Sequence, residues 1–138
     1  MGEGVVFSED ESRGALISCQ IFANAGVGVC VANGADPLVL GCRVHGGRSC
    51  GILVQEEGAG SFRDNEIYGH EASEVEIRSG GMPAMQDNSV HSSFGCGILV
   101  DSAGGSLRGN DIYGNARAGV RLMSGADAVF VGNKVMTG

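Results

Sequence analysis

Residues 110–122 read NDIYGNARAGVRL, and this stretch decides the fold. An asparagine is followed two residues later by an isoleucine, and a glycine then opens a short run in which apolar residues alternate with others. The same frame recurs at intervals of 22 or 23 residues, starting at Cys19, Cys42, Asn65, Asn88 and Asn133. Internal repeats of this length are typical of solenoids and related arrays, so we expect the chain to consist of stacked copies of one unit.

The repeat aligns apolar residues into columns. Within each unit these residues recur at a spacing of two, which is the periodicity of a β-strand, and glycine bounds the runs. One column holds Ile21, Val44, Ile67, Val90, Ile112 and Val135, and others start at Leu16, Val29 and Val31. Three short strands per unit predict an all-β fold. It is a right-handed parallel β-helix of about six coils, each of 22–23 residues and about 4.8 Å from the next.

The position that opens each frame predicts a sharp corner. Asparagine occupies it in the later units, since asparagine tolerates left-handed backbone and its amide can pair with the amides above and below. We therefore expect an asparagine ladder along this corner. Cys19 and Cys42 occupy it in the first units and would lie close enough for a disulfide by distance alone. Two free thiols are favoured, because the side chains at this corner point in parallel directions.

Composition restricts the partners and the compartment. The net charge of −7 over 138 residues argues against nucleic acid or an anionic membrane as partner, because both require a basic face. No apolar run has the length of a transmembrane helix, and residues 1–4 do not resemble the start of a signal peptide. Five cysteines, an odd number at no metal-ligand spacing, indicate reduced thiols. We therefore expect an intracellular, cytoplasmic protein.

We expect a single β-helix domain over residues 1–138. The sequence starts and stops within a repeat unit, and no amphipathic helix or polar strand is present to cap either end. An uncapped solenoid exposes apolar residues and unpaired strand edges. Two explanations stay open. The chain is a piece of a longer solenoid, or its ends pair with another chain, for example in an end-to-end homo-oligomer.

The repeats also resemble known families. The frame at 110–122, and the Cys/Asn-x-apolar-His frames at 42–54 and 88–100, resemble the β-helix repeats of carbohydrate-binding and sugar-hydrolase proteins. Such repeats occur in pectin-processing enzymes with the pectin lyase-like fold, alginate epimerases and periplasmic metal-maturation proteins. They look most similar to the β-helix of F-box-only ubiquitin-ligase receptors, where Asn-x-Ile also precedes an aromatic residue. Because the repeated positions are core and corner positions, the resemblance implies a fold and is weak for function.

One outward column is aromatic or imidazole. It contains Phe22, His45, Tyr68, His91 and Tyr113. The column could be a platform for sugar rings or for a peptide. The favoured interpretation is that the rings stack on one another and shield the strand edge, at about 0.5–1.5 kcal/mol per pair.

A second outward row runs along the glycine-led strands and starts at Cys30. The candidate partner surface is the part of this row that contains Leu53, Glu76, Leu99 and Arg121. Leu53 and Leu99 would form an exposed apolar strip rimmed by charge, which is typical of a contact surface. Surface ion pairs are expected here, either Glu76 with Arg121 or Arg78 with Asp101, and they should contribute little to stability.

No group of residues predicts a catalytic, metal or cofactor site. His70 lies near Glu71 and Glu74 in a loop; this could be an acid/base pair but is more typical of a solvated loop. The carboxylates of Asp64, Glu66, Asp87 and Asp111 are expected to be scattered. The leading prediction is a non-enzymatic scaffold for protein–protein recognition, by a partner protein or a neighbouring domain. The alternatives are a carbohydrate-binding or carbohydrate-modifying module, of the lyase or epimerase type, and a spacer within a longer solenoid.

Overall fold

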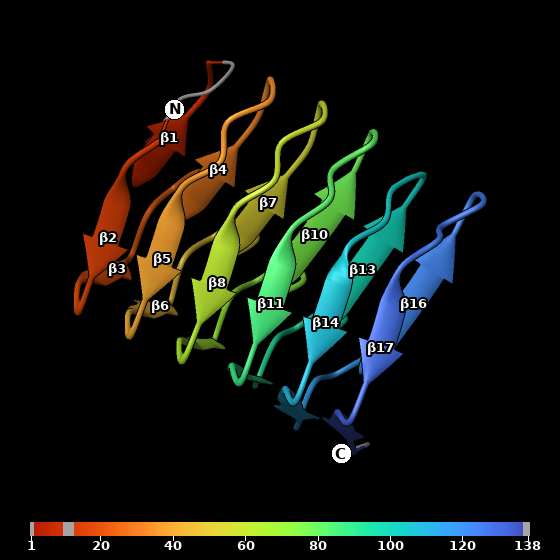
Figure 1. Cartoon of the computed structure of the whole chain (residues 1–138). Helices are drawn as coiled ribbons and strands as arrows, with labels where there is room; N and C mark the ends of the chain where they lie inside the picture. Colours follow the sequence, from red (N-terminus) through yellow and green to blue (C-terminus); the bar gives the residue numbers. More distant parts are fainter. Residues whose placement is uncertain (1, 10–12, 137–138) are drawn as a thin grey trace.

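The computed structural model describes residues 2–9 and 13–136 and arranges their strands into three parallel sheets (Figure 1). Sheet A contains β1 (Val5–Phe7), β4 (Val29–Val31), β7 (Ile52–Val54), β10 (Val75–Arg78), β13 (Ile98–Asp101) and β16 (Val120–Met123). Sheet B contains β2 (Ala15–Ile17), β5 (Leu38–Leu40), β8 (Ser61–Arg63), β11 (Ala84–Gln86), β14 (Ser106–Arg108) and β17 (Val129–Val131). Sheet C contains β3 (Gln20–Phe22), β6 (Arg43–His45), β9 (Glu66–Tyr68), β12 (Ser89–His91), β15 (Asp111–Tyr113) and β18 (Lys134–Val135).

Each coil contributes one strand to every sheet, so the chain is a parallel β-solenoid, as the repeat predicts. The coils follow one another along a single axis, and the described ends of the chain lie at opposite ends of the stack (Figure 1). The register is the one expected from the columns, since Val90 pairs with Ile67 on one side and with Ile112 on the other. The first strand also joins this order, with Val5 paired to Val29.

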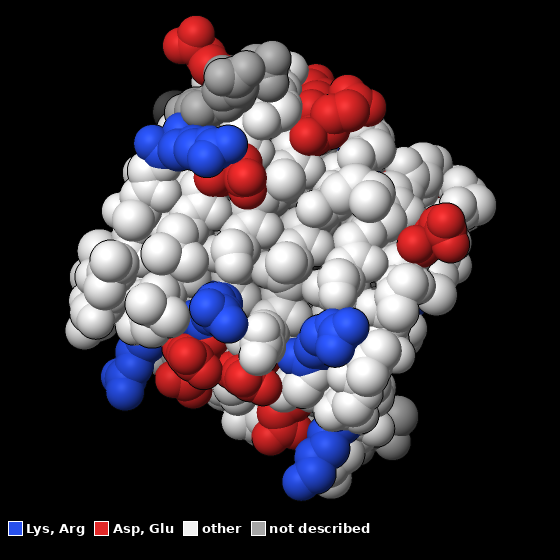
Figure 2. Space-filling model, viewed as in Figure 1, with Lys and Arg blue, Asp and Glu red and all other residues white. Residues whose placement is uncertain are grey.

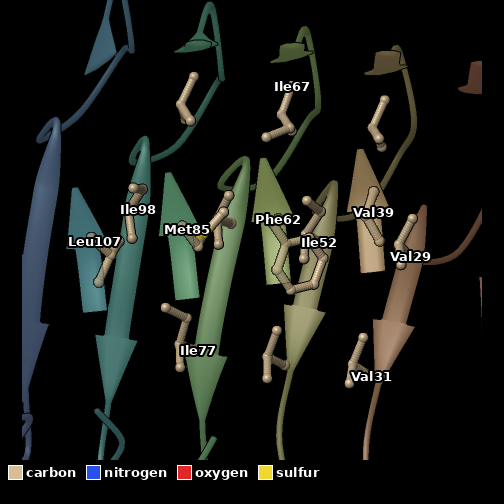
Figure 3. Packing of buried hydrophobic residues seen from close by; sticks show 14 of the residues in the cluster. Val29, Val31, Val39, Ile52, Phe62, Ile67, Ile77, Met85, Ile98 and Leu107 are labelled. Atoms are coloured by element: carbon tan, nitrogen blue, oxygen red, sulfur yellow. The ribbon is translucent and has the colours of Figure 1, made fainter. Parts of the chain in front are cut away.

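The core is a set of stacked apolar columns between the three sheets. Figure 3 shows side chains such as Phe62, Ile52 and Ile77 filling this space, and each of the three is fully buried. A parallel strand three residues long has little stability by itself, so burial of these columns provides the main driving force. The pattern is visible in β9, where the central Ile67 is buried while the residues on either side face outward.

The asparagine ladder is present, and its geometry repeats from coil to coil. The Asn88 amide nitrogen donates to the Asn110 side-chain oxygen at 2.9 Å and to the Phe62 carbonyl at 3.0 Å. In turn, the Asn88 side-chain oxygen accepts from both the backbone and the side-chain nitrogen of Asn65, at 3.0 and 2.9 Å. The ladder ends on Cys42, whose backbone N–H donates to Asn65 Oδ1 at 2.8 Å.

The expected reason for asparagine at the corner is wrong in one respect. The left-handed residue is the one before it: φ is 55° at Asp64 and 57° at Asp87, whereas no corner asparagine has a positive φ. The equivalent residues are Ser18, Gly41, Gly109 and Gly132, and all four have positive φ. Asparagine is therefore required for its amide, and the bend itself lies one residue earlier.

Glycine before the sheet-A strands is required by close packing of neighbouring coils. A Cβ at Gly28 would lie 2.7 Å from the carbonyl oxygen of Gly51, and one at Gly97 would lie 2.6 Å from that of Gly119. Both distances are below van der Waals contact, so a larger residue would separate the coils.

The inward columns are less covered in the last coil. Leu122 is 51% exposed and Val135 is 50% exposed, although the residues that precede them in their columns, Val100 and Ile112, are fully buried. Among the described residues there is no helix, and hence none long and apolar enough to cross a membrane. Whether the ends pair with another chain stays a prediction.

Candidate functional site

Two rows of side chains project outward from sheet C. Each three-residue strand of this sheet buries its central residue and directs the first and third outward. The first residues make a polar row, which contains Gln20, Arg43, Glu66, Ser89, Asp111 and Lys134. The third residues make the predicted aromatic column, which contains Phe22, His45, Tyr68, His91 and Tyr113.

The rings of this column stack face to face. Successive ring centroids are 5.2, 4.9, 5.1 and 4.7 Å apart, and successive rings are within 6° of parallel. Each ring thus covers the face of its neighbour and presents an edge to solvent. A sugar needs a free ring face to stack upon, so the interior of the column offers none. The stacking itself is as expected, whereas a role for the column in binding stays a prediction.

A groove follows the corner between sheets B and C. It has a volume of about 470 Å³ and takes its lining from four successive coils. The lining residues are Gly41, Cys42, Arg43, Asp64, Asn65, Glu66, Asp87, Asn88, Ser89, Gly109 and Asp111. We call this the corner groove. Figure 2 shows acidic side chains gathered, with basic ones beside them, along the lower ends of the sheet-B strands.

The groove gathers the four carboxylates that were expected to be scattered. Asp64 and Asp87 are the left-handed residues that precede the ladder asparagines, and Glu66 and Asp111 belong to the polar row. Arg43 is the one basic residue among the lining side chains. Gly109, in the next coil, leaves room for the Asp87 carboxylate, because a Cβ at this position would collide with it. The lining therefore carries a net negative charge.

A short network connects the groove to the aromatic column. The Arg43 guanidinium lies 3.7 Å from Glu66 Oε1, and His91 Nε2 lies 2.9 Å from Glu66 Oε2. The Glu66 side chain is 38% exposed and the His91 side chain 14%. A ligand lying in the groove could thus reach Glu66 directly and His91 at its edge.

The candidate partner surface on sheet A is in register but less exposed than expected. Cys30, Leu53, Glu76, Leu99 and Arg121 occupy successive strands side by side. Leu53 and Leu99 are both half-buried, so they do not form an exposed apolar strip.

The ion pairing on this sheet also differs from the prediction. Arg78 contacts Glu76 at 2.6 Å, within one strand, whereas pairs across coils were expected. Residues two apart on a strand project from the same face, and the long Arg78 side chain spans that interval. Glu76, whose side chain is only 12% exposed, is thereby neutralised between the two leucines.

His70 and Glu74 do not form a solvated loop. His70 is 1% exposed and Glu74 is fully buried. His70 Nδ1 lies 2.5 Å from Glu74 Oε1, and the His70 backbone N–H donates to Glu74 Oε2 at 3.0 Å. The preceding coil has glycine at both equivalent positions, and a Cβ at Gly51 would lie 2.9 Å from the imidazole. The two glycines leave room for this pair, which is therefore part of the packed interior and closed to a substrate.

The five cysteines are free thiols, as expected. The Cys42 thiol donates weakly to the Leu16 and Leu40 carbonyls at 3.4 and 3.5 Å, and burial raises its pKa. Burial, followed by the nearby charge of Glu76, raises the pKa of Cys50 to about 12. Among the described residues, no group of three or more His, Cys, Asp or Glu side chains is placed to hold a metal ion.

Comparison with known proteins agrees with this architecture. The Azotobacter vinelandii mannuronan C-5 epimerase AlgE4 A-module superposes with a TM-score of 0.63 over 98% of this chain, at 13% sequence identity. The AlgE6 A-module of the same organism superposes with a TM-score of 0.55 over 98% of this chain, also at 13% identity. The chain spans about half the length of these modules, 50% and 55% respectively. At such identity the likeness concerns the fold alone.

No curated protein matches the sequence. The likeness to F-box-only receptors is likewise not shown and stays a prediction. The family description "Right handed beta helix region" matches residues 1–109 and 40–138, which together span the whole sequence. The chain therefore belongs to the right-handed β-helix family.

Proposed function

We propose that this β-helix is a scaffold for protein recognition and that it binds an extended, basic segment of a partner along the corner groove. The observation that carries the proposal is the lining of that groove, where Asp64, Glu66, Asp87 and Asp111 stand against the single cation of Arg43. The whole chain has the same sign, with a net charge of −7. Charge complementarity of this kind steers encounter and fixes orientation.

The dimensions favour an extended ligand. Four coils contribute to the lining, and three coil spacings of about 4.8 Å give a length of about 14 Å. At about 3.4 Å per residue, that length accommodates about four residues of extended peptide. Lysine or arginine residues along such a segment would then lie within reach of carboxylates from more than one coil.

The test is binding of a short peptide rich in lysine and arginine, measured by fluorescence anisotropy. The double variant Asp64→Asn/Asp87→Asn should weaken binding by at least tenfold, since asparagine also accepts the left-handed backbone and only the charge changes. The matched control is Glu56→Gln/Glu57→Gln, which removes two exposed charges from left-handed positions in another turn. Equal loss in both double variants would mean that only net charge matters, and the groove assignment would be wrong.

The sheet-A row is a second candidate surface. Leu53 and Leu99 flank Glu76, whose charge is paired with that of Arg78, so the middle of this row is nearly neutral. A partner that docks on this row should be lost in the variant Leu53→Glu/Leu99→Glu. Both leucines face outward, so the fold should be retained, as circular dichroism would check. Capture of the same partner by this variant would remove the row from the site.

A carbohydrate ligand is the alternative, favoured by the similarity of fold to the mannuronan epimerase modules. The acidic groove would repel a polyuronate, so this alternative predicts a neutral or amino-bearing glycan. Retention on a glycan array, abolished by Asp64→Asn/Asp87→Asn, would favour it over the peptide. End-to-end association and an intracellular location are also proposals, the second supported by the free thiols.

A further inference from the structure

Ser92 is hydrogen-bonded to the histidine that precedes it, and that histidine is bonded to an acid. Ser92 Oγ lies 2.8 Å from His91 Nδ1, and His91 Nε2 lies 2.9 Å from Glu66 Oε2. A carboxylate can only accept, so the bond to Glu66 places the ring proton on Nε2. Nδ1 then carries the lone pair and accepts the Ser92 O–H. A hydroxyl, a base and an acid thus lie in series, which is the arrangement that activates a serine nucleophile.

Within residues 2–9 and 13–136, the other coils lack this series. The residues equivalent to Ser92 there are Ala23, Gly46, Gly69 and Gly114, none of which has a hydroxyl. His45 occupies the same column as His91, but Gly46 follows it and it makes no such contact to an acid. Ser92 has a φ of 62°, a conformation for which glycine is favoured.

The surroundings hold the base and expose the nucleophile. The His91 ring is stacked between Tyr68 and Tyr113, with centroids 5.1 and 4.7 Å away. Its edge nitrogens are therefore fixed in direction, and its side chain is only 14% exposed. Ser92 is exposed at the outer edge of the same column, so an electrophile can approach it from solvent.

We propose that Ser92 is a nucleophile that takes up the acyl group of an activated ester, with His91 as the general base and Glu66 as the positioning residue. Ser92 Oγ forms a bond to the carbonyl carbon while its proton passes to His91 Nδ1. The tetrahedral species then breaks the bond to the leaving oxygen, which takes the proton from Nδ1. The product is an acyl ester on Ser92. Water, deprotonated by the same nitrogen, then bonds to the acyl carbon; the bond to Ser92 Oγ breaks, Oγ takes the proton back from Nδ1, and the carboxylic acid is released.

The substrate class follows from the donors nearby. The backbone N–H of Ser92 donates to the Tyr113 carbonyl at 3.3 Å, and that of Ser93 to Asn115 Oδ1 at 3.0 Å. Neither is available to a developing oxyanion. Loss of even one such donor costs about 10²–10³ in rate, so amides and unactivated esters are excluded as useful substrates. Esters with a good leaving group, and phosphonyl fluorides, remain within reach.

The test uses a fluorophosphonate probe on the whole chain. Ser92 Oγ bonds to phosphorus, fluoride leaves, and the proton is taken up by His91, so peptide mass spectrometry locates the label. We expect one label per chain, at Ser92, and none there in Ser92→Gly, a variant that the fold accepts because glycine occupies this position in other coils. The control is Ser102→Gly, because Ser102 is also exposed, left-handed and bonded to an acid, Asp101, but has no histidine beside it. Labelling of Ser92 should be unchanged in this control.

The role of the base is tested by His91→Asn, which should slow labelling at least tenfold, since a general base contributes about 10²–10⁴. Glu66→Gln leaves the ring stack intact and should slow labelling several-fold. Nitrogen-15 NMR of the imidazole should show the Nε2-protonated tautomer in the native protein and a loss of that preference in Glu66→Gln. The proposal is overturned if Ser92 labels no faster than Ser102, or if both His91→Asn and Glu66→Gln label at the native rate.

Discussion

At the scale of single residues, the same amino acid has different chemistry according to its depth in the coil. Cys19 is half-buried and Cys50 is 3% exposed, although both are free thiols. Burial raises the pKa of Cys50 from 9.0 to about 12, and the charge of Glu76 acts in the same direction. The thiolate is the reactive form of cysteine, so the two should differ in rate.

We predict that iodoacetamide at about pH 8 modifies Cys19 of the native protein and leaves Cys50 unmodified. Cys42 and Cys96, which are also buried, should be protected as well. Peptide mass spectrometry after timed quenching measures each site, and all five thiols should react once the chain is unfolded in urea. Modification of Cys50 at the rate of Cys19 in the folded protein would contradict the packing around it.

At the scale of elements, the asparagine ladder connects successive coils at the corner between sheets B and C. Asn88→Ala removes the amide that bonds Asn65, Asn110 and the Phe62 carbonyl, and leaves buried polar groups without partners. We predict a loss of roughly 3 kcal/mol in the free energy of unfolding, measured by urea denaturation. Asn133 lies in the last described coil and is half-buried, so Asn133→Ala should reduce the free energy of unfolding clearly less. Equal decreases in the free energy of unfolding for Asn88→Ala and Asn133→Ala would show that burial does not determine the contribution of a ladder asparagine.

The strands were predictable from the sequence because a buried face must repeat with the coil. An inward column such as Ile67, Val90 and Ile112 consists of apolar residues 22 or 23 positions apart, and the register follows from aligning them. The stacking of the outward rings was also predictable, because outward positions repeat in the same register as inward ones. The backbone angle at Asp64 was not, because serine, glycine and aspartate share that column and no single residue type marks it.

The candidate site could be predicted only in part, since side-chain pairing depends on neighbours in other coils. In the corner groove, Gly109 makes room for the side chain of Asp87 in the preceding coil. The hydrogen bond that fixes His91, the neighbour of Ser92, comes from Glu66, which also belongs to the preceding coil. Spacing suggested that Glu76 pairs across coils, yet Arg78 in the same strand reaches it first. One signal was available: Glu74 stands where the other coils have glycine, and its partner His70 lies four residues earlier.

At the scale of the whole molecule, repetition turns one corner into a continuous groove. No single coil could hold an extended ligand, but four coils place residues 41–43, 64–66, 87–89, 109 and 111 along one line. The same geometry sets the sheet-A row on one face and places the groove beside the aromatic column of sheet C. A ligand on sheet A is therefore distinguished from one in the groove by the residues it contacts.

The most direct test of the account is an NMR titration of the nitrogen-15-labelled protein with a short peptide rich in lysine and arginine. We predict that the backbone amides whose signals shift belong to residues 41–43, 64–66, 87–89, 109 and 111, with the rest of the spectrum nearly unchanged. The shifts should shrink as salt is raised, because the contacts are exposed ion pairs. Shifts confined to the Leu53–Leu99 row of sheet A, or no shifts at all, would contradict the corner groove as the recognition site.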